Sequence, residues 1–154
     1  MEIKELKDRP GINQSTKLNS VYVQFNNLLN ELKTKKLSNE TLKAINNGIE
    51  KLNAVSDSDK DLAKEIKSTQ SHIIKLLEKE HKLVTKNHYR NLWLALGMAA
   101  FGIPLGVAFG AVLDNMALLA IGLPIGMLIG IAVGTRLDKK ALAEGRQIDV
   151  EVRL

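Results

Sequence analysis

Apolar and polar positions are spaced differently along the chain, and the longest apolar stretch carries the main prediction. From residue 92 to residue 134, the only strongly polar side chains are Asp114 and Asn115, near the middle. A single helix of this stretch would be roughly 65 Å long, about twice the ~30 Å hydrocarbon core of a bilayer. The stretch therefore predicts two membrane spans rather than one.

The polar pair divides the stretch into a helical hairpin. We expect spans at residues 92–112 and 117–134, joined by a tight connection through residues 113–116. Each span has close to the ~20 residues that a transmembrane helix needs. The alternative is a soluble helical hairpin buried in a protein core.

Ahead of the hairpin, apolar residues recur three and four positions apart, the spacing of one helical face. Three amphipathic helices are predicted, with faces formed by Leu18, Val21, Phe25, Leu28 and Leu32, by Leu42, Ile45, Ile49 and Leu52, and by Leu62, Ile66, Thr69, Ile73 and Leu76. Ser38 is the expected N-cap of the second helix, which Gly48 weakens. Because no proline follows Pro10 before the hairpin, the third helix is expected to continue from about Ser58 through Lys86 into the first span.

These elements predict an all-α membrane protein. Its expected segments are a flexible lead at 1–14 containing Pro10 and Gly11, a cytoplasmic helical region at 15–90, the transmembrane hairpin at 91–135 and a cytoplasmic tail at 136–154. The helical region must bury its apolar stripes. It can do so in a bundle within one chain, in an intermolecular coiled coil, or by combining both, and we favour the combination. A cytoplasmic protein partner is a further hypothesis.

The tail contains two short patterns. Residues 137–144 can extend the second span as a helix that Gly145 ends. The chain then alternates apolar and polar side chains, with Ile148, Val150, Val152 and Leu154 as the apolar set. This period predicts either a docked strand or a loose tail, since a lone strand is unstable.

Glycine spacing is the strongest motif of the hairpin. Eight of the eleven glycines lie in it, mostly four residues apart: Gly97, Gly102, Gly106, Gly110, Gly122, Gly126, Gly130 and Gly134. A glycine face lets another helix backbone approach closely, which drives helix packing in lipid. Counting from Asp114 places Gly106 level with Gly122, and Gly102 level with Gly126. The faces can thus meet within the hairpin or between protomers.

Two prolines occupy matching positions in the spans. Pro104 lies ten residues before Asp114 and Pro124 ten after it, within a repeat of the form Gly-x-Pro-x-Gly. On antiparallel helices both lie about 15 Å from the turn, at the bilayer midplane. We expect each to kink its helix, as a static bend or as a moving hinge.

Charge gives the orientation. The formal net charge is +5, and the residues expected at the membrane interface are Lys82, Lys86, Tyr89, Arg90 and Trp93 before the first span and Arg136, Lys139 and Lys140 after the second. Because Lys and Arg are retained on the cytoplasmic side, both termini are expected there. Anionic lipids are the expected partners of these bases. Nucleic acid is not, because few aromatic residues and many acids accompany the bases.

Little of the chain suggests catalysis or cofactor binding. There is no cysteine, so thiolate metal sites and cysteine nucleophiles are excluded. His81 and His88 are seven residues apart and can share a helix face, but metal sites prefer closer spacing and more ligands. We expect no metal, no cofactor and no enzymatic activity.

Asp114 has two interpretations, and Asn115 shares the first. Both residue types favour turns, and the pair then simply connects the spans. In an oligomer of hairpins around an axis, Asp114 would instead form a ring of carboxylates at an outer mouth, and such rings select cations.

The glycine ladders and the short connection make residues 92–135 resemble the broad group of bacterial glycine-zipper membrane hairpins. The resemblance implies close helix packing in a bacterial inner membrane. Our leading hypothesis is a non-enzymatic integral membrane protein that forms a homo-oligomeric assembly or anchoring scaffold through its glycine faces and cytoplasmic helices. The alternatives are an ion-conducting pore and an effector that disrupts the membrane when triggered.

Overall fold

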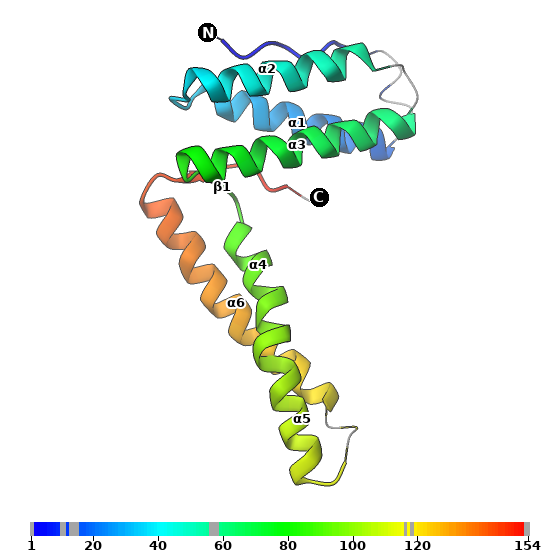
Figure 1. The fold of residues 1–154 in the computed structure, drawn as a ribbon, viewed down its shortest axis with the longest axis vertical. Helices are drawn as coiled ribbons and strands as arrows, with labels where there is room; N and C mark the ends of the chain where they lie inside the picture. Colours follow the sequence, from blue (N-terminus) through cyan, green and yellow to red (C-terminus); the bar gives the residue numbers. More distant parts are fainter. Residues whose placement is uncertain are drawn as a thin grey trace. The chain divides into compact units, whose positions relative to one another are not determined.

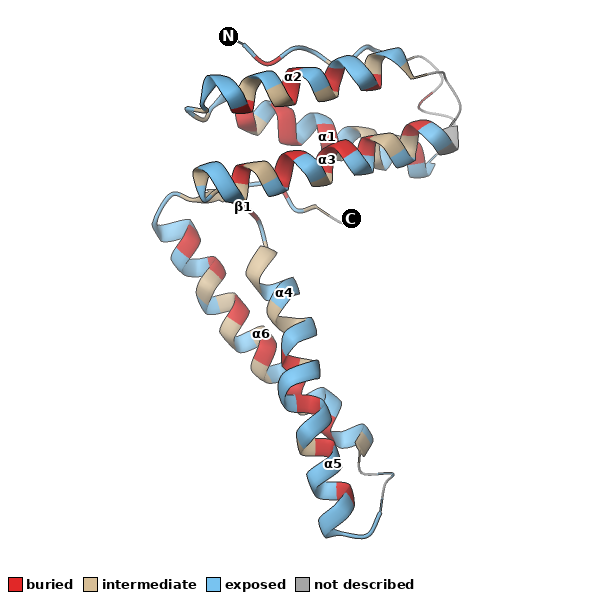
Figure 2. Ribbon diagram, in the orientation of Figure 1, coloured by how far each residue is buried: buried red, intermediate tan, exposed pale blue. Residues whose placement is uncertain are grey.

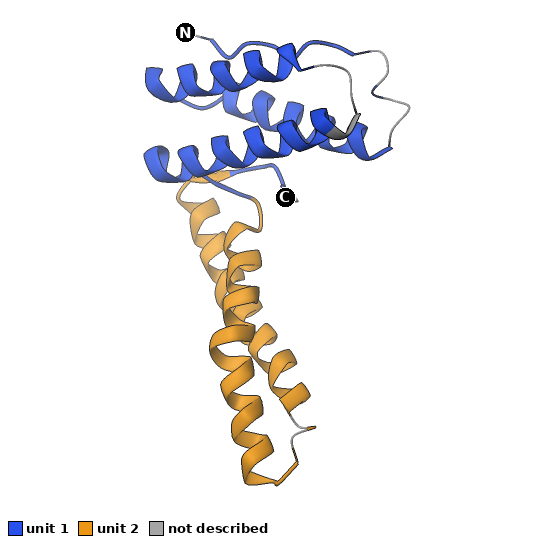
Figure 3. Ribbon diagram, turned by 45° about the vertical axis from the view of Figure 1, so that its right-hand side comes forward, with its two compact units in different colours: residues 1–85, 148–154 blue, residues 86–147 orange. Residues whose placement is uncertain are grey.

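The computed structural model describes residues 2–9, 12, 16–55, 59–115, 117 and 119–152. It is mainly helical, and its elements follow in the order α1 (Thr16–Lys33), α2 (Asn39–Ala54), α3 (Asp59–His81), β1 (Val84–Thr85), α4 (His88–Gly97), η2 (Met98–Gly102), α5 (Ile103–Val112), α6 (Leu119–Ala143) and β2 (Gln147–Ile148) (Figure 1). They form two compact units, unit 1 of residues 1–85 and 148–154 and unit 2 of residues 86–147 (Figure 3).

Unit 1 has a core built from the three predicted helical stripes. Phe25 of α1, Ile45 of α2 and Ile66 of α3 are fully buried in one apolar cluster. The stripes thus bury one another within a single chain. The stripe of α3 changes phase near its end, where Leu77 is fully buried and Leu76 only half-buried.

Helix α2 begins and packs as its sequence indicates. The Ser38 hydroxyl accepts a hydrogen bond from the Thr41 N–H at 3.2 Å, which confirms the predicted N-cap. Gly48 does not break the helix. A Cβ atom there would lie 2.8 Å from Cγ2 of Thr69 on α3, so the missing side chain lets α2 and α3 approach closely.

The N-terminal residues are docked, in contrast to the flexible lead expected at 1–14. Residues 2–9 have no regular secondary structure and hydrogen-bond to α2 through the side chains of Asn46 and Asn53. Ile3 and Ile12 are buried in the unit 1 core. The residues around Pro10 suggested a flexible segment. The side chains that hold residues 2–9 are spread along α2, far away in the sequence.

The expected continuous helix from Ser58 through Lys86 into the hairpin is wrong. Helix α3 ends at His81, Lys82 adopts a left-handed conformation with φ 57°, and the Leu83 N–H returns to the Leu77 carbonyl at 3.2 Å. Asn87, with φ 59°, makes a second break before α4. A non-glycine residue takes the left-handed conformation at both points, so the usual glycine signal is missing.

The C-terminal tail takes the docked form of the two alternatives. Helix α6 ends at Ala143 and Gly145 follows with φ 68°, as predicted. Strands β1 and β2 then pair in a two-stranded sheet. Ile148 and Val150 are buried in the unit 1 core, which explains the alternating pattern.

Tyr22 provides a test of the docked N-terminal segment. Its hydroxyl donates to the Lys7 carbonyl at 2.9 Å, and its pKa is raised above 10.0, first by burial and then by the negative charge of Asp8, with Arg9 opposing. The fold therefore favours the neutral phenol. Its stabilising contribution is full below pH 10.0 and is lost as pH rises through the raised pKa of Tyr22.

We expect phenolate absorbance of a Tyr89→Phe variant, in which Tyr22 is the remaining tyrosine, to titrate above pH 10.0 in the folded protein. The additional change Asp8→Asn removes a repulsive charge and moves the midpoint down. Denaturant provides the control, because the unfolded chain returns to the ordinary tyrosine pKa. A folded-state midpoint at or below the unfolded one contradicts the docked arrangement.

Candidate functional site: the glycine interface of the helical hairpin

Unit 2 contains two helical runs that are long and apolar enough to cross a membrane. They are His88–Val112, formed by α4, η2 and α5, and Leu119–Ala143, which is α6, with 25 residues each. The predicted spans at 92–112 and 117–134 coincide with their apolar parts, except that α6 begins at Leu119. Residues 116 and 118 lie outside the described residues.

Glycine makes nearly all of the hairpin's interior. The buried residues of α4, η2, α5 and α6 are the eight predicted glycines together with Asp138 and Ala141. Large apolar residues of both runs are exposed, among them Phe109 and Leu128, and Figure 2 shows buried positions recurring at intervals along otherwise exposed helices. Only 17% of the apolar window of the first run and 22% of that of the second are buried.

The glycines of one run contact the backbone of the other. A Cβ atom on Gly126 would lie 2.6 Å from Cα of Gly102, and one on Gly122 would lie 2.6 Å from Cα of Gly106. These are the two pairs that counting from Asp114 places level. The sequence allowed the glycine faces to meet within the hairpin or between protomers. The structure shows them packed within the hairpin.

A π-helical turn keeps the first glycine face continuous. Gly97 and Gly102 are five residues apart, whereas the other neighbouring glycines within a span are four apart. On a regular α-helix, five residues would rotate Gly97 well away from the face. In η2 the Ile103 N–H bonds to the Met98 carbonyl, an i to i+5 bond that absorbs the extra residue.

The two prolines are less alike than their matching positions predict. Pro104 stands directly after the π-turn, at the start of α5, whereas Pro124 lies inside the uninterrupted helix α6. The π-helical turn thus lies in the first run, whereas in α6 Pro124 simply lacks the N–H that would bond to the Ala120 carbonyl. The hinge stays a hypothesis.

Asp138 joins the open end of the hairpin and was not singled out from the sequence. Its Oδ1 accepts the Tyr89 N–H at 3.0 Å and its Oδ2 accepts the Arg90 N–H at 2.9 Å. Helix α4 makes no side-chain capping bond of its own and has no acid in its first turn. A carboxylate from α6 therefore satisfies its free N–H groups and faces the positive end of its dipole.

Asp138 also continues the ladder of α6, four residues after Gly134. A Cβ on Gly134 would lie 2.5 Å from the Tyr89 carbonyl oxygen, so the glycine brings α6 against the first turn of α4. Glycine faces that repeat every four residues pack almost equally well after a four-residue slide. Asp138 bonds to the start of α4 in the observed register, so these hydrogen bonds favour that register.

The predicted interface residues of unit 2 gather at the end that Asp138 closes. Lys86, Arg90, Arg136, Lys139 and Lys140 are exposed, whereas Tyr89 and Trp93 are half-buried. Lys82, also exposed, belongs to unit 1.

Arg146 adds a further cation in unit 2. Hydrogen bonds to the Glu144 carboxylate and to Tyr89 raise the pKa of its guanidinium. Glu144 also lies 3.9 Å from Nζ of Lys140. The Tyr89 and His88 rings meet edge to face with centroids 5.0 Å apart.

At the other end, Asp114 and Asn115 form the turn. Asp114 has a left-handed φ of 48°, which Asp tolerates well, and the Asn115 N–H bonds to the Gly110 carbonyl at 2.9 Å. The Asn115 side chain accepts the Ala117 N–H at 3.1 Å. These bonds agree with the interpretation in which Asp114 and Asn115 form the turn that connects the two spans.

His81 and His88 belong to different helices. His81 ends α3, and its Nε2 lies 2.9 Å from the Thr41 hydroxyl, whereas His88 begins α4. The shared helix face considered for them is therefore wrong. Within the described parts of the chain, no three His, Asp or Glu side chains form a metal-binding group.

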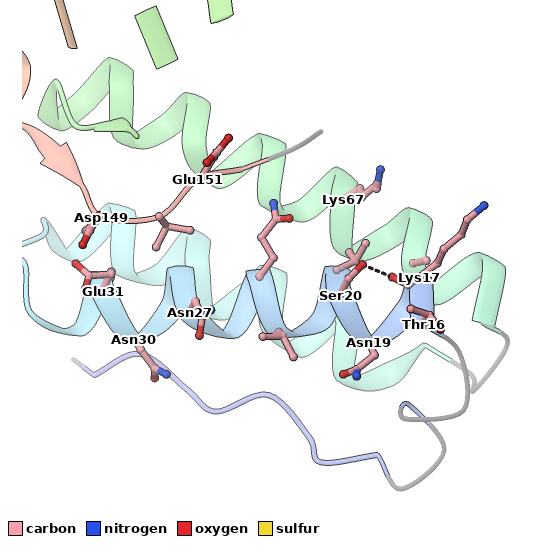
Figure 4. Close-up of a pocket in the computed structure, with 15 residues that line it drawn as sticks. Thr16, Lys17, Asn19, Ser20, Asn27, Asn30, Glu31, Lys67, Asp149 and Glu151 are labelled. Carbon is pink, nitrogen blue, oxygen red and sulfur yellow. Dashed lines mark hydrogen bonds between the residues drawn. The ribbon is translucent and has the colours of Figure 1, made fainter. Parts of the chain in front are cut away.

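Unit 1 has an open groove of about 1220 Å³ between α1, α3 and the C-terminal tail. Glu31 and Asp149 lie toward one end of the groove, Lys17 and Lys67 lie toward the other, and amides and hydroxyls of α1 lie along it (Figure 4). These side chains can bind polar groups, but they do not form a nucleophile with a base and an orienting partner.

No protein-family model, curated protein or solved structure matches this chain. The functional interpretation therefore depends on the residues and their geometry.

The glycine interface predicts that stability responds differently to substitution at two nearby positions of α6, one buried and one exposed. Gly130→Ala places a methyl group against the Trp93 backbone, 2.8 Å from its carbonyl carbon. We expect the two helices to move apart and the free energy of unfolding to fall by about 1–3 kcal/mol. Ala132→Val enlarges an exposed position and leaves stability nearly unchanged. The measurement is the SDS-induced transition of the single tryptophan, Trp93, in detergent micelles. A stabilised Gly130→Ala, as helix propensity alone would give, contradicts the interface.

The capping role of Asp138 is tested beside an exposed neighbour. Asp138→Ala leaves two N–H groups of α4 without their acceptor, and we expect it to destabilise the hairpin by about 0.5–2 kcal/mol. Asp138→Asn keeps one acceptor oxygen and gives a smaller loss. The control, Lys139→Ala, stays within about 0.5 kcal/mol. If Asp138→Ala and the control unfold at the same SDS concentration, the capping role of Asp138 is contradicted.

Proposed function

We propose that this chain is a non-enzymatic integral membrane protein in which the hairpin of unit 2 anchors the helical domain of unit 1. The observation that carries the proposal is the inverted packing of the hairpin, with glycine inside and large apolar side chains outside. In water such an apolar surface is costly and rare. In lipid the same surface is favourable.

The hairpin meets the other demands of a bilayer. Each run of 25 residues is about 37 Å long, enough to cross a ~30 Å hydrocarbon core with some tilt. Helices satisfy their backbone hydrogen bonds internally, as lipid requires. Close contact of small residues is how helices associate without a hydrophobic driving force.

The charges support one orientation. Exposed Lys and Arg side chains lie at the end that contains both connections to unit 1, whereas the turn at Asp114 and Asn115 has no base. By the positive-inside rule, both termini are cytoplasmic and the turn faces the opposite side of the membrane. The membrane in this proposal is a bacterial inner membrane. Attraction to anionic headgroups strengthens membrane binding by about 1 kcal/mol for each of these Lys and Arg side chains. Tyr89 and Trp93 supply aromatic anchors at the same interface.

The proposed role is an anchoring scaffold that assembles with its own copies. The glycine faces are occupied within the hairpin, so copies that keep the hairpin closed meet through its outward faces or through unit 1. This changes the initial hypothesis, in which glycine faces join protomers.

Cysteine labelling tests the insertion and the orientation, because the chain has no native cysteine. In intact spheroplasts, an impermeant maleimide is expected to label Asn115→Cys but not Lys139→Cys, and both after permeabilisation. Leu128→Cys, at a position 68% exposed on the isolated protein, stays unlabelled in both states because lipid covers it. The cysteine-free chain is the control. Labelling of Leu128→Cys in membranes, or recovery of the protein in the soluble fraction, contradicts the proposal.

A further inference from the structure

The N-terminal segment, residues 2–9, binds unit 1 as a peptide binds a receptor. The Asn46 side chain accepts the Lys4 N–H at 2.8 Å and donates to the Glu2 carbonyl at 2.9 Å. Asn53 repeats the pattern three residues further along the segment, accepting the Lys7 N–H at 2.8 Å and donating to the Glu5 carbonyl at 3.3 Å. Each side-chain amide thus binds one backbone N–H and one backbone carbonyl of the segment, from residues two positions apart.

The two amides match the repeat of an extended chain. Seven residues of α2 separate Asn46 from Asn53, a rise of roughly 10.5 Å along the helix. Three residues of extended chain, from Lys4 to Lys7, cover roughly 10 Å. The helix therefore presents two amide clamps at the spacing of the backbone that they hold.

Further contacts fix the direction and the position of the segment. The Arg9 guanidinium donates to the Leu52 and Val55 carbonyls, both at 2.9 Å, at the C-terminal end of α2. Tyr22 of α1 donates to the Lys7 carbonyl. Ile3 is buried in the core, and Lys4 pairs with Glu50 of α2.

We propose that these clamps form a peptide-binding site for residues 2–9 and that a second copy of the chain can supply the occupant, so that copies exchange their N-terminal segments. A second copy offers the same Ile3, Lys4 and Arg9 to the same peptide-binding site, so exchange loses none of these contacts. Replacing an intramolecular element by its identical counterpart is a low-cost route to dimers.

Concentration sets how often exchange occurs. A tethered segment competes with an effective concentration in the mM range, so the closed form dominates in dilute solution. Any open copy nevertheless presents an unoccupied peptide-binding site to a neighbour's segment. The proposal does not depend on membrane insertion, and its experiment can succeed in detergent even if the anchoring role fails.

Two single-cysteine variants of the full-length chain can trap the exchanged form. Lys4→Cys and Glu50→Cys replace two exposed residues in contact. In a mixture of the two variants, a disulfide between positions 4 and 50 requires the segment of one copy to occupy the peptide-binding site of another. Differently sized tags identify the product by its mass. We expect the 4–50 product to accumulate under mild oxidation.

Matched variants separate docking from collision. Lys51→Cys, next to Glu50 and exposed, replaces Glu50→Cys and is expected to give little product with Lys4→Cys. Adding Asn46→Ala and Asn53→Ala to the Glu50→Cys chain removes the four hydrogen bonds of both clamps. We expect at least about tenfold less 4–50 product, because this chain then holds a neighbour's segment with far fewer contacts. Because Asn46 is buried, Asn53→Ala alone serves as the milder variant.

The double variant Lys4→Cys/Glu50→Cys completes the test. It reports the closed form, because its disulfide forms within one chain. A double variant that closes as a monomer, with no 4–50 product from the mixed single variants, overturns the exchange. A product of equal yield with Glu50→Cys and Lys51→Cys overturns it as well, because it shows collision alone.

Discussion

Backbone-to-backbone contact between two helices is the constraint on which the hairpin depends. Glycine at the interface leaves no room for a side chain between the two runs, as at Gly102 and Gly126. The large apolar side chains of both helices must then lie outside. One local requirement, close approach, thus produces a surface that water disfavours and lipid accepts.

The same contact explains two irregular features of unit 2. The π-turn η2 accommodates the five-residue step from Gly97 to Gly102 and returns Gly97 to the interface. Asp138 occupies the next step of the ladder after Gly134 and caps α4. A repeating glycine face supplies proximity but specifies register weakly, and a single buried carboxylate with two N–H partners specifies it strongly. In unit 1, Asn46 and Asn53 play a comparable part for residues 2–9.

Sequence patterns predicted the elements more fully than the connections between them. Helical stripes such as that of Phe25, the Ser38 cap and the stop at Gly145 depend on local chemistry, which neighbouring residues reveal. The break at Lys82 was missed because a non-glycine residue takes the left-handed conformation there. Asp138 was overlooked because it stands among the charges of the tail, and its partners lie 48 and 49 residues away. The level pairs of glycines followed from counting, but whether they met within one chain required the three-dimensional fold.

Spin labels in lipid vesicles test most directly the claim that the hairpin exposes its apolar side chains to lipid. Nitroxides attached through cysteine at Ile103 and Leu128, which are 49% and 68% exposed on the protein, report collisions with oxygen and with a water-soluble nickel complex. The account predicts frequent collisions with oxygen and few with nickel at both positions. Frequent collisions with nickel, or protection from both reagents, would contradict it by placing these side chains in water or inside protein.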